Sequence, residues 1–116
     1  MSIDSVIKQR SMVFARRIVR LYQYLSKEHR EFVMSKQILR SGTSIGANIA
    51  EAIYGSSRKD FVAKLQIAQK EAAETLYWLE LLQSCDYIPG NLFVSLRDDC
   101  KELLAMLAAS IKSCAE

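Results

Sequence analysis

The chain contains few residues that break a helix or form a turn. Its 116 residues include one proline and four glycines, whereas an all-β domain needs a turn signal at roughly every tenth residue. Half of the residues are apolar and a quarter are charged, which is the composition of a globular protein rather than of a disordered one. We therefore expect a single all-α domain over residues 1–116.

Long uncharged stretches are also absent. The longest, such as 41–50 and 87–96, fall short of the roughly 20 residues that cross a bilayer. The N-terminal residues include Asp4, Lys8 and Arg10 and lack the charged-then-apolar layout of a signal peptide. We therefore expect no membrane segment and a cytoplasmic location.

The chain is poor in metal ligands and in reactive side chains. Its three cysteines, Cys85, Cys100 and Cys114, form no CxxC pair, so they are expected to be small buried apolar residues in a reducing compartment. His29 is the single histidine, and a carboxylate-bridged metal site would need Glu-x-x-His motifs on facing helices. With no metal set and no nucleophile beside a base, we expect no cofactor and no enzymatic activity.

Apolar residues recur at helical spacing in four stretches. The expected helices run from the cap Asp4 to Lys27, from the cap Ser35 to Gly55, from the cap Ser56 or Ser57 to Asp86, and from about Phe93 to Cys114. Short loops place consecutive helices side by side, so the chain is predicted to form an antiparallel up-down-up-down four-helix bundle.

The third stretch has the clearest pattern and carries two apolar stripes. The first stripe is Phe61, Leu65, Ala68, Ala72, Thr75, Leu79 and Leu82. The second stripe, beside it, is Ile67, Trp78, Leu81 and Cys85. Two stripes indicate a wide buried face, which packs either deep in the bundle or against a second subunit as well.

The segment from Ser41 to Ala52 contains glycine at helical spacing. Gly42 and Gly46 lack the Lys-Ser/Thr pair and the preceding strand of a phosphate loop. Glycine inside a helix costs roughly 1 kcal/mol, so the spacing indicates a face that another backbone approaches closely. Asn48 and Glu51, three residues apart on the same helix, are interpreted as structural hydrogen-bonding residues, with a ligand-binding pair as the alternative.

Positive charge is concentrated in the first third of the chain. Residues 1–40 hold nine Lys and Arg against three acids, a net +6, while residues 41–116 hold seven against ten, a net −3. Clustered cations bind phosphate backbones, and Tyr22 and Tyr24 can stack on unpaired bases. The candidate nucleic-acid-binding residues are Arg10, Arg16, Arg17, Arg20, Lys27, Arg30, Lys36 and Arg40. The alternative is that these cations form an ordinary solvated face.

The part of the chain from Leu39 to Leu79 carries a family resemblance. From Leu39-Arg40-Ser41-Gly42 through Asn48-Ile49-Ala50-Glu51-Ala52, and on through Asp60-Phe61, Lys64-Leu65, Ile67-Ala68, Lys70-Glu71-Ala72 and Glu74-Thr75-Leu76-Tyr77-Trp78-Leu79, the chain resembles the bacterial four-helix bundle proteins encoded in 23S rRNA intervening sequences. The Ser-Ile-x-x-Asn-Ile-Ala-Glu core is specific to that family, although many members have glycine at Ala52 and proline at Gly46.

The resemblance implies an antiparallel four-helix bundle, a homo-oligomer that is commonly a pentamer, and no established catalytic activity. A related branch, the accessory variability proteins of diversity-generating retroelements, binds RNA and a reverse transcriptase through a basic pentameric surface. Two functions therefore remain open for this chain. One is an oligomer that binds structured RNA through the basic residues, and the other is a protein-interaction or scaffold module without nucleic-acid binding.

Overall fold

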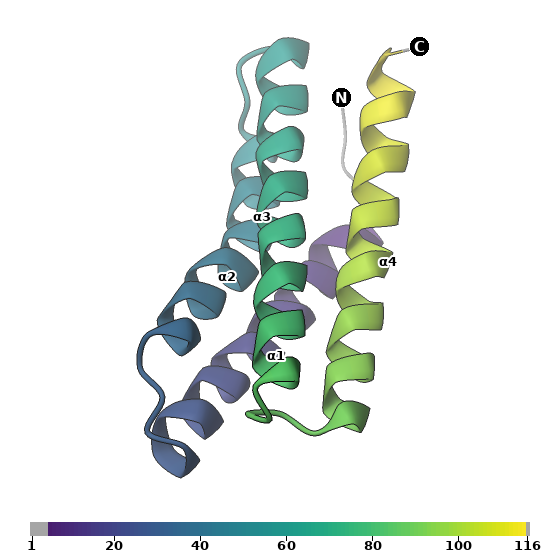
Figure 1. Ribbon diagram of the computed structural model, residues 1–116. Coiled ribbons are helices and arrows are strands. Elements are labelled where there is room, and N and C mark those ends of the chain that lie inside the picture. Colours follow the sequence, from purple (N-terminus) through teal and green to yellow (C-terminus); the bar gives the residue numbers. More distant parts are fainter. Residues whose placement is uncertain (1–4, 116) are drawn as a thin grey trace.

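The computed structural model describes residues 5–115, which form four α-helices and no strand. The helices are α1 (Ser5–Glu28), α2 (Met34–Ile53), α3 (Arg58–Ser84) and α4 (Gly90–Ala115). Each packs against its neighbours in sequence, and α4 also packs against α1. Consecutive helices run in opposite directions, with α1 lying obliquely behind the others (Figure 1). The predicted antiparallel four-helix bundle is confirmed, while the expected cap at Asp4 lies outside the described residues.

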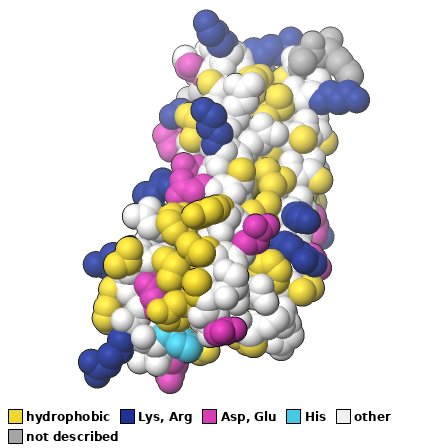
Figure 2. Space-filling view, in the orientation of Figure 1, with side chains coloured by type: hydrophobic (Ala, Val, Ile, Leu, Met, Phe, Trp, Pro, Cys, Tyr) yellow, Lys and Arg dark blue, Asp and Glu magenta, His cyan; other side chains and the backbone are white. Residues whose placement is uncertain are grey.

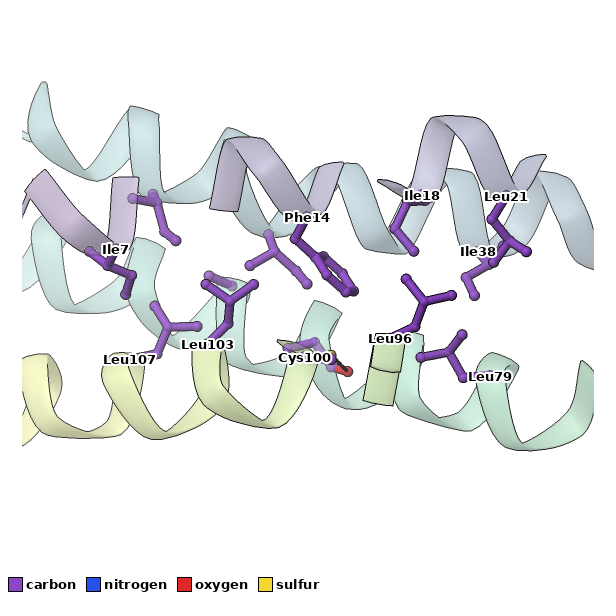
Figure 3. Close-up of a cluster of buried hydrophobic side chains, with 14 of the residues drawn as sticks. Ile7, Phe14, Ile18, Leu21, Ile38, Leu79, Leu96, Cys100, Leu103 and Leu107 are labelled. Atoms are coloured by element: carbon purple, nitrogen blue, oxygen red, sulfur yellow. Dashed lines mark hydrogen bonds between the residues drawn. The ribbon is translucent and has the colours of Figure 1, made fainter. Parts of the chain in front are cut away.

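One apolar stripe of each helix forms the core (Figure 3). The first predicted stripe of α3 is buried at every position from Phe61 to Leu82. On α4, the buried stripe includes Leu96, Leu103 and Leu107. The helical periodicity therefore identified the core because the same spacing that brings side chains to one face also brings them together inside the bundle.

The second predicted stripe of α3 stays largely outside this core. Ile67 is 41% exposed, Trp78 and Leu81 are half-buried, and Cys85 is exposed. The expected burial of Cys85 is therefore wrong, because this cysteine is exposed at the C-terminal cap of α3, beyond the last buried residue of that helix, Leu82. The second stripe is only partly covered, with Ile67 and Cys85 exposed and Trp78 packed against the edge of the core.

Cys100, in contrast, is completely buried on α4. Its thiol donates to the carbonyl oxygen of Ala72 on α3, with Sγ and O 3.4 Å apart. Burial, together with the nearby Asp99 carboxylate, raises the pKa of the Cys100 thiol to about 12. This cysteine therefore packs as a small apolar residue, as expected.

The start of α2 differs from the prediction. Ser35 is buried inside the first turn and is not the cap, since Val33 occupies the capping position without a side-chain bond. Instead, the Glu31 carboxylate accepts hydrogen bonds from the amides of Val33, Met34 and Ser35 at 2.9–3.1 Å. A negative side chain that reaches the first amides of a helix satisfies orphan donors and complements the helix dipole. The longer glutamate side chain makes this cap possible from two residues ahead of the capping position, Val33.

The connection from α2 to α3 also needs one correction. Helix α2 ends at Ile53, yet no glycine among the described residues has a positive φ, so Gly55 does not adopt the expected left-handed conformation. A Cβ on Gly55 would lie 3.1 Å from the Ala52 carbonyl oxygen, so glycine is favoured by crowding. Ser57 caps α3 as predicted, because its side chain accepts from the Asp60 amide at 3.1 Å.

Two non-glycine residues occupy the left-handed region, and both follow a helix. Arg30, after α1, has φ 50°, and Asp86, after α3, has φ 65°. In each case the next amide bonds back across the turn: that of Glu31 to the Leu25 carbonyl at 3.0 Å, and that of Tyr87 to the Leu82 carbonyl at 2.9 Å. The Tyr87 bond is that of a Schellman ending, which usually places glycine at the left-handed position, whereas the Glu31 bond reaches one residue further back.

Candidate nucleic-acid interface

The glycine segment of α2 is the place where α1 comes closest. A Cβ on Gly42 would lie 2.8 Å from Cγ1 and Cγ2 of Ile18, and a Cβ on Gly46 would lie 3.3 Å from the Ser11 hydroxyl. Gly42 is buried beneath α1. The glycine segment therefore packs against α1 of the same chain, and the buried residues of the segment are not available to bind another protein.

Asn48 and Glu51 bond to separate partners. The Asn48 amide donates to the Ser44 carbonyl of its own helix at 2.8 Å. The Glu51 carboxylate is exposed and pairs with the Lys64 ammonium of α3 at 3.1 Å. Both residues have partners that suit a structural role in the bundle.

Two of the eight candidate cations pair with acids across the seam between α1 and α4. Arg10 forms an ion pair with Glu102. Arg17 donates to the Asp99 carboxylate at 2.6 Å and to the Ser95 hydroxyl at 2.9 Å. These guanidinium groups therefore link the first and last helices, and their charge is balanced locally.

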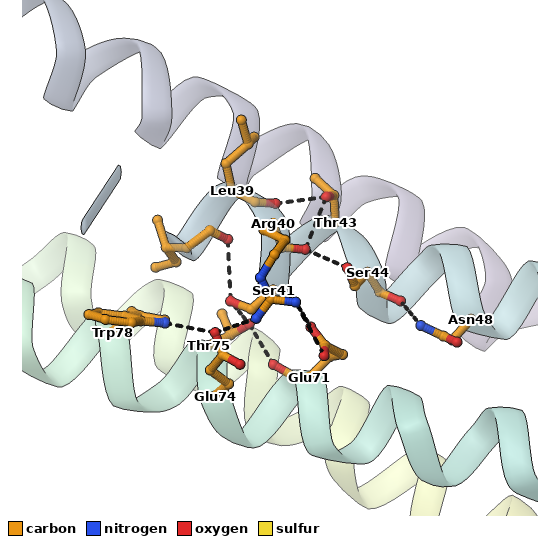
Figure 4. A network of polar contacts seen from close by, with 11 residues as sticks. Leu39, Arg40, Ser41, Thr43, Ser44, Asn48, Glu71, Glu74, Thr75 and Trp78 are labelled. Atoms are coloured by element: carbon orange, nitrogen blue, oxygen red, sulfur yellow. Dashed lines mark hydrogen bonds and ion pairs between the residues drawn. The ribbon is translucent and has the colours of Figure 1, made fainter. Parts of the chain in front are cut away.

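A third cation, Arg40, belongs to a polar network between α2 and α3 (Figure 4). Its guanidinium group bonds to Glu71 at 3.1 Å and to Glu74 at 2.5 Å. The Trp78 indole donates to the same Glu74 carboxylate at 3.0 Å. The bonds from Trp78 and Arg40 lower the pKa of Glu74 below its ordinary value. Beneath them, the Thr75 hydroxyl donates to that of Ser41 at 2.9 Å.

The remaining five cations have no acidic partner among the described residues. They are Arg16, Arg20, Lys27, Arg30 and Lys36, and all five are exposed. The first three lie on α1, Arg30 lies in the loop after it, and Lys36 lies in the first turns of α2.

Three of these five candidate cations lie on one strip of the surface of α1. Steps of four and three residues repeat along a helix face, and they connect the exposed side chains of the strip, which we term the α1 ridge: Gln9, Val13, Arg16, Arg20, Gln23 and Lys27. The ridge is the buried stripe of α1 shifted by two residues, which is about 200° around the helix. It therefore faces away from the core and contains no carboxylate.

An aromatic contact that the sequence did not reveal lies near the end of the ridge. The Tyr24 hydroxyl and Nε2 of His29 are 3.1 Å apart, and their rings meet edge to face at 5.2 Å. The His29 ring also meets Tyr87, from the loop between α3 and α4, at 5.5 Å. The contact joins two loops that are distant in sequence, so local spacing carries no signal for it.

No group of three or more His, Cys, Asp or Glu side chains within residues 5–115 is arranged to hold a metal ion. None of the four described helices is long and apolar enough to span a bilayer.

The described residues thus define a helical bundle in which Arg10, Arg17 and Arg40 pair with acids of a neighbouring helix, and in which the first helix presents a ridge of cations without acidic partners. The chain belongs to the 23S rRNA-intervening sequence protein family, whose sequence pattern matches residues 4–109. It is also similar to a solved protein of unknown function from the S23 ribosomal protein family of Bacteroides thetaiotaomicron. That structure shares 56% sequence identity and a TM-score of 0.92, over 93% of this chain and 96% of the other. No curated protein matches the chain.

Proposed function

We propose that this protein is a non-enzymatic homo-oligomer that binds structured RNA through the α1 ridge. The observation that carries the proposal is the separation of cations into two sets. Arg10, Arg17 and Arg40 are neutralised by carboxylates, whereas Arg16, Arg20 and Lys27 face solvent without one. Unpaired cations on one strip are suited to phosphate contacts, which dominate the affinity of nucleic-acid binding.

The length of the ridge suits several phosphates in a row. Arg16 and Lys27 are 11 residues apart, which corresponds to about 16 Å along a helix. Arg30 and Lys36 continue the cationic run beyond the end of α1. The family's association with 23S rRNA intervening sequences makes a hairpin from such a sequence the first RNA to test.

An exposed apolar surface supports the oligomeric part of the proposal. Apolar side chains gather over the lower part of α2 and α3 (Figure 2), where Tyr77 is 57% exposed and meets the Trp78 ring at 5.0 Å. Ile67, on the second stripe of the same helix, is 41% exposed. Self-association through such surfaces would repeat the ridge in every subunit, and repeated weak contacts bind with high avidity.

The proposal is tested by fluorescence anisotropy with a labelled rRNA hairpin over a salt series, on protein of known mass in solution. The double variant R16Q/K27Q removes two ridge cations. The matched control K101Q/K112Q removes two exposed cations from α4. Each lost phosphate contact should reduce the slope of log affinity against log salt by about 1, so the ridge variant should bind more weakly and with a shallower slope than the control.

Three results would contradict the proposal. An equal effect of the two double variants would show that net charge rather than the ridge determines binding. A lack of binding at about 50 mM salt, where phosphate contacts are strongest, would favour the protein-interaction module. The observation behind that alternative is the exposed Tyr77, which contacts the half-buried Trp78 ring. A strictly monomeric mass at micromolar concentration would contradict the oligomer.

A further inference from the structure

A hollow lies between α1 and α4, beside the α1 ridge. It has a volume of about 300 Å³ and is lined by Arg17, Arg20, Leu21, Tyr24, Leu92 and Leu96. Three leucines supply apolar lining, while the two arginines and the tyrosine supply the polar groups. The volume is at the lower end of that of small-molecule sites, and an apolar lining with a few polar groups is typical of them.

The charge of the hollow is positive and comes from one free group. Arg17 is held by Asp99 and Ser95, so its guanidinium is already satisfied. Arg20 has no acidic partner among the described residues and is exposed. None of the lining residues is an acid, so an anion near Arg20 would not meet a carboxylate from the lining itself.

The aromatic side of the hollow is held in place. Tyr24 is 37% exposed, yet its hydroxyl is bonded to His29 at 3.1 Å and its ring meets the imidazole at an interplanar angle of 72°. His29 in turn contacts the Tyr87 ring. Because the Tyr24 ring is already positioned by this chain of contacts, little rotamer entropy is lost when a flat ligand stacks on it.

A ring stacked on tyrosine, a leucine-lined cavity and one free guanidinium together fit a base with its phosphate. Arg20 belongs to both the ridge and the hollow, so a strand whose phosphates follow the ridge would bring its next nucleotide to the cavity. We propose that the hollow takes one unpaired base of a bound RNA, stacked on Tyr24, with its phosphate on Arg20. This inference rests on the proposed function, because the ridge must first hold the RNA.

The test compares two hairpins with equal numbers of phosphates, one fully paired and one with a single bulged 2-aminopurine. Wild-type protein should bind the bulged hairpin more tightly, and the 2-aminopurine fluorescence should be quenched as the base stacks. The variant Y24L should weaken binding of the bulged hairpin by about 5- to 150-fold, which is the usual range for loss of one base–aromatic stack. Binding of the paired hairpin should not change.

Two further variants separate stacking from damage to the fold. Tyr22 is the other tyrosine that the sequence offered for stacking, but in the structure it is half-buried and does not line the hollow, so Y22L should leave both affinities unchanged. L92W fills the hollow from α4 and should remove the preference for the bulge while circular dichroism stays that of the wild type.

The outcomes distinguish this inference from the function on which it rests. If both hairpins bind equally and the 2-aminopurine signal does not change, the hollow is not a base site, although the ridge still binds RNA. Loss of the bulge preference in Y22L as well as in Y24L would also overturn the inference. If neither hairpin binds the wild-type protein, the proposed function fails, and the inference fails with it.

Discussion

Replacing Gly42 by alanine should destabilise the bundle, because a Cβ there would lie 2.8 Å from two carbons of Ile18. Ile18 is fully buried, and a β-branched side chain in a helix has one strongly preferred rotamer, so it cannot swing aside. Overpacking of a core lowers the free energy of unfolding by about 1–3 kcal/mol, and we expect about 3 kcal/mol for so close a contact. Alanine recovers about 1 kcal/mol of helix propensity, so the net loss should be about 2 kcal/mol.

The measurements are urea unfolding and thermal unfolding, both followed by circular dichroism at one fixed protomer concentration. A loss of about 2 kcal/mol should lower the thermal midpoint by about 8 °C for a chain of this size. Two other glycines are internal controls. A Cβ on Gly46 meets the Ser11 hydroxyl at 3.3 Å, and a Cβ on Gly90 meets nothing within 4 Å. G46A should therefore change stability little, and G90A should not destabilise.

The close approach also predicts a coupling. I18A removes the γ carbons that the new Cβ would meet, so the double variant G42A/I18A should lose less stability than the two single variants added together. Equal stability of G42A and G90A would refute the reasoning, because it would mean that Gly42 is not where α1 and α2 are held together. Strict additivity in the double variant would refute it as well.

Three other outcomes follow from single contacts. R30G should raise the free energy of unfolding by about 0.5–1 kcal/mol, because Arg30 has φ 50° and the left-handed region costs a non-glycine residue about 1–2 kcal/mol. Part of this gain is offset, since glycine loses more chain entropy on folding. The same variant should weaken RNA binding, and a lower stability in urea would contradict the expected gain. The lowered pKa of Glu74 stabilises the fold above the ordinary pKa of 4.5, and this stability is lost as pH falls through the lower pKa of the folded state. The difference in unfolding free energy between wild type and E74Q should therefore become smaller on acidification. A difference that does not depend on pH would count against this explanation. Cys85 is exposed and Cys100 is buried, with the pKa of the Cys100 thiol raised to about 12, so a thiol reagent should modify Cys85 in the native protein and Cys100 only on unfolding.

The core could be predicted from the sequence because its signal is local. The seven-residue stripe of α3 needs only the spacing along one helix, and the same spacing determines which side chains share a face. The second stripe has the same local signal, yet Ile67 and Cys85 are exposed in this chain. Periodicity identifies an apolar face, but what covers that face depends on how the other helices are placed.

The details of the candidate interface depended on contacts that spacing cannot reveal. Arg17 and Asp99 are 82 residues apart in sequence, so the sequence alone could not separate this paired arginine from the unpaired Arg16 beside it. The cap of α2 was misassigned for a related reason. Ser35 is a common capping residue type, whereas Glu31 reaches three amides only because the chain turns back just before the helix.

The α1 ridge is not arranged as stability alone would favour. Arg16 and Arg20 are like charges four residues apart, an arrangement that costs a helix about 0.2–0.5 kcal/mol. Gln9 and Gln23 lie on the same strip and are uncharged, although acids at these positions would balance the arginines. The arrangement is the opposite between α1 and α4, where Arg10 and Arg17 each pair with a carboxylate of α4. Two arginines of α1 thus pair with carboxylates of α4, whereas the cations of the outward strip have no acidic partner among the described residues, and such a local conflict with stability is expected at a functional surface.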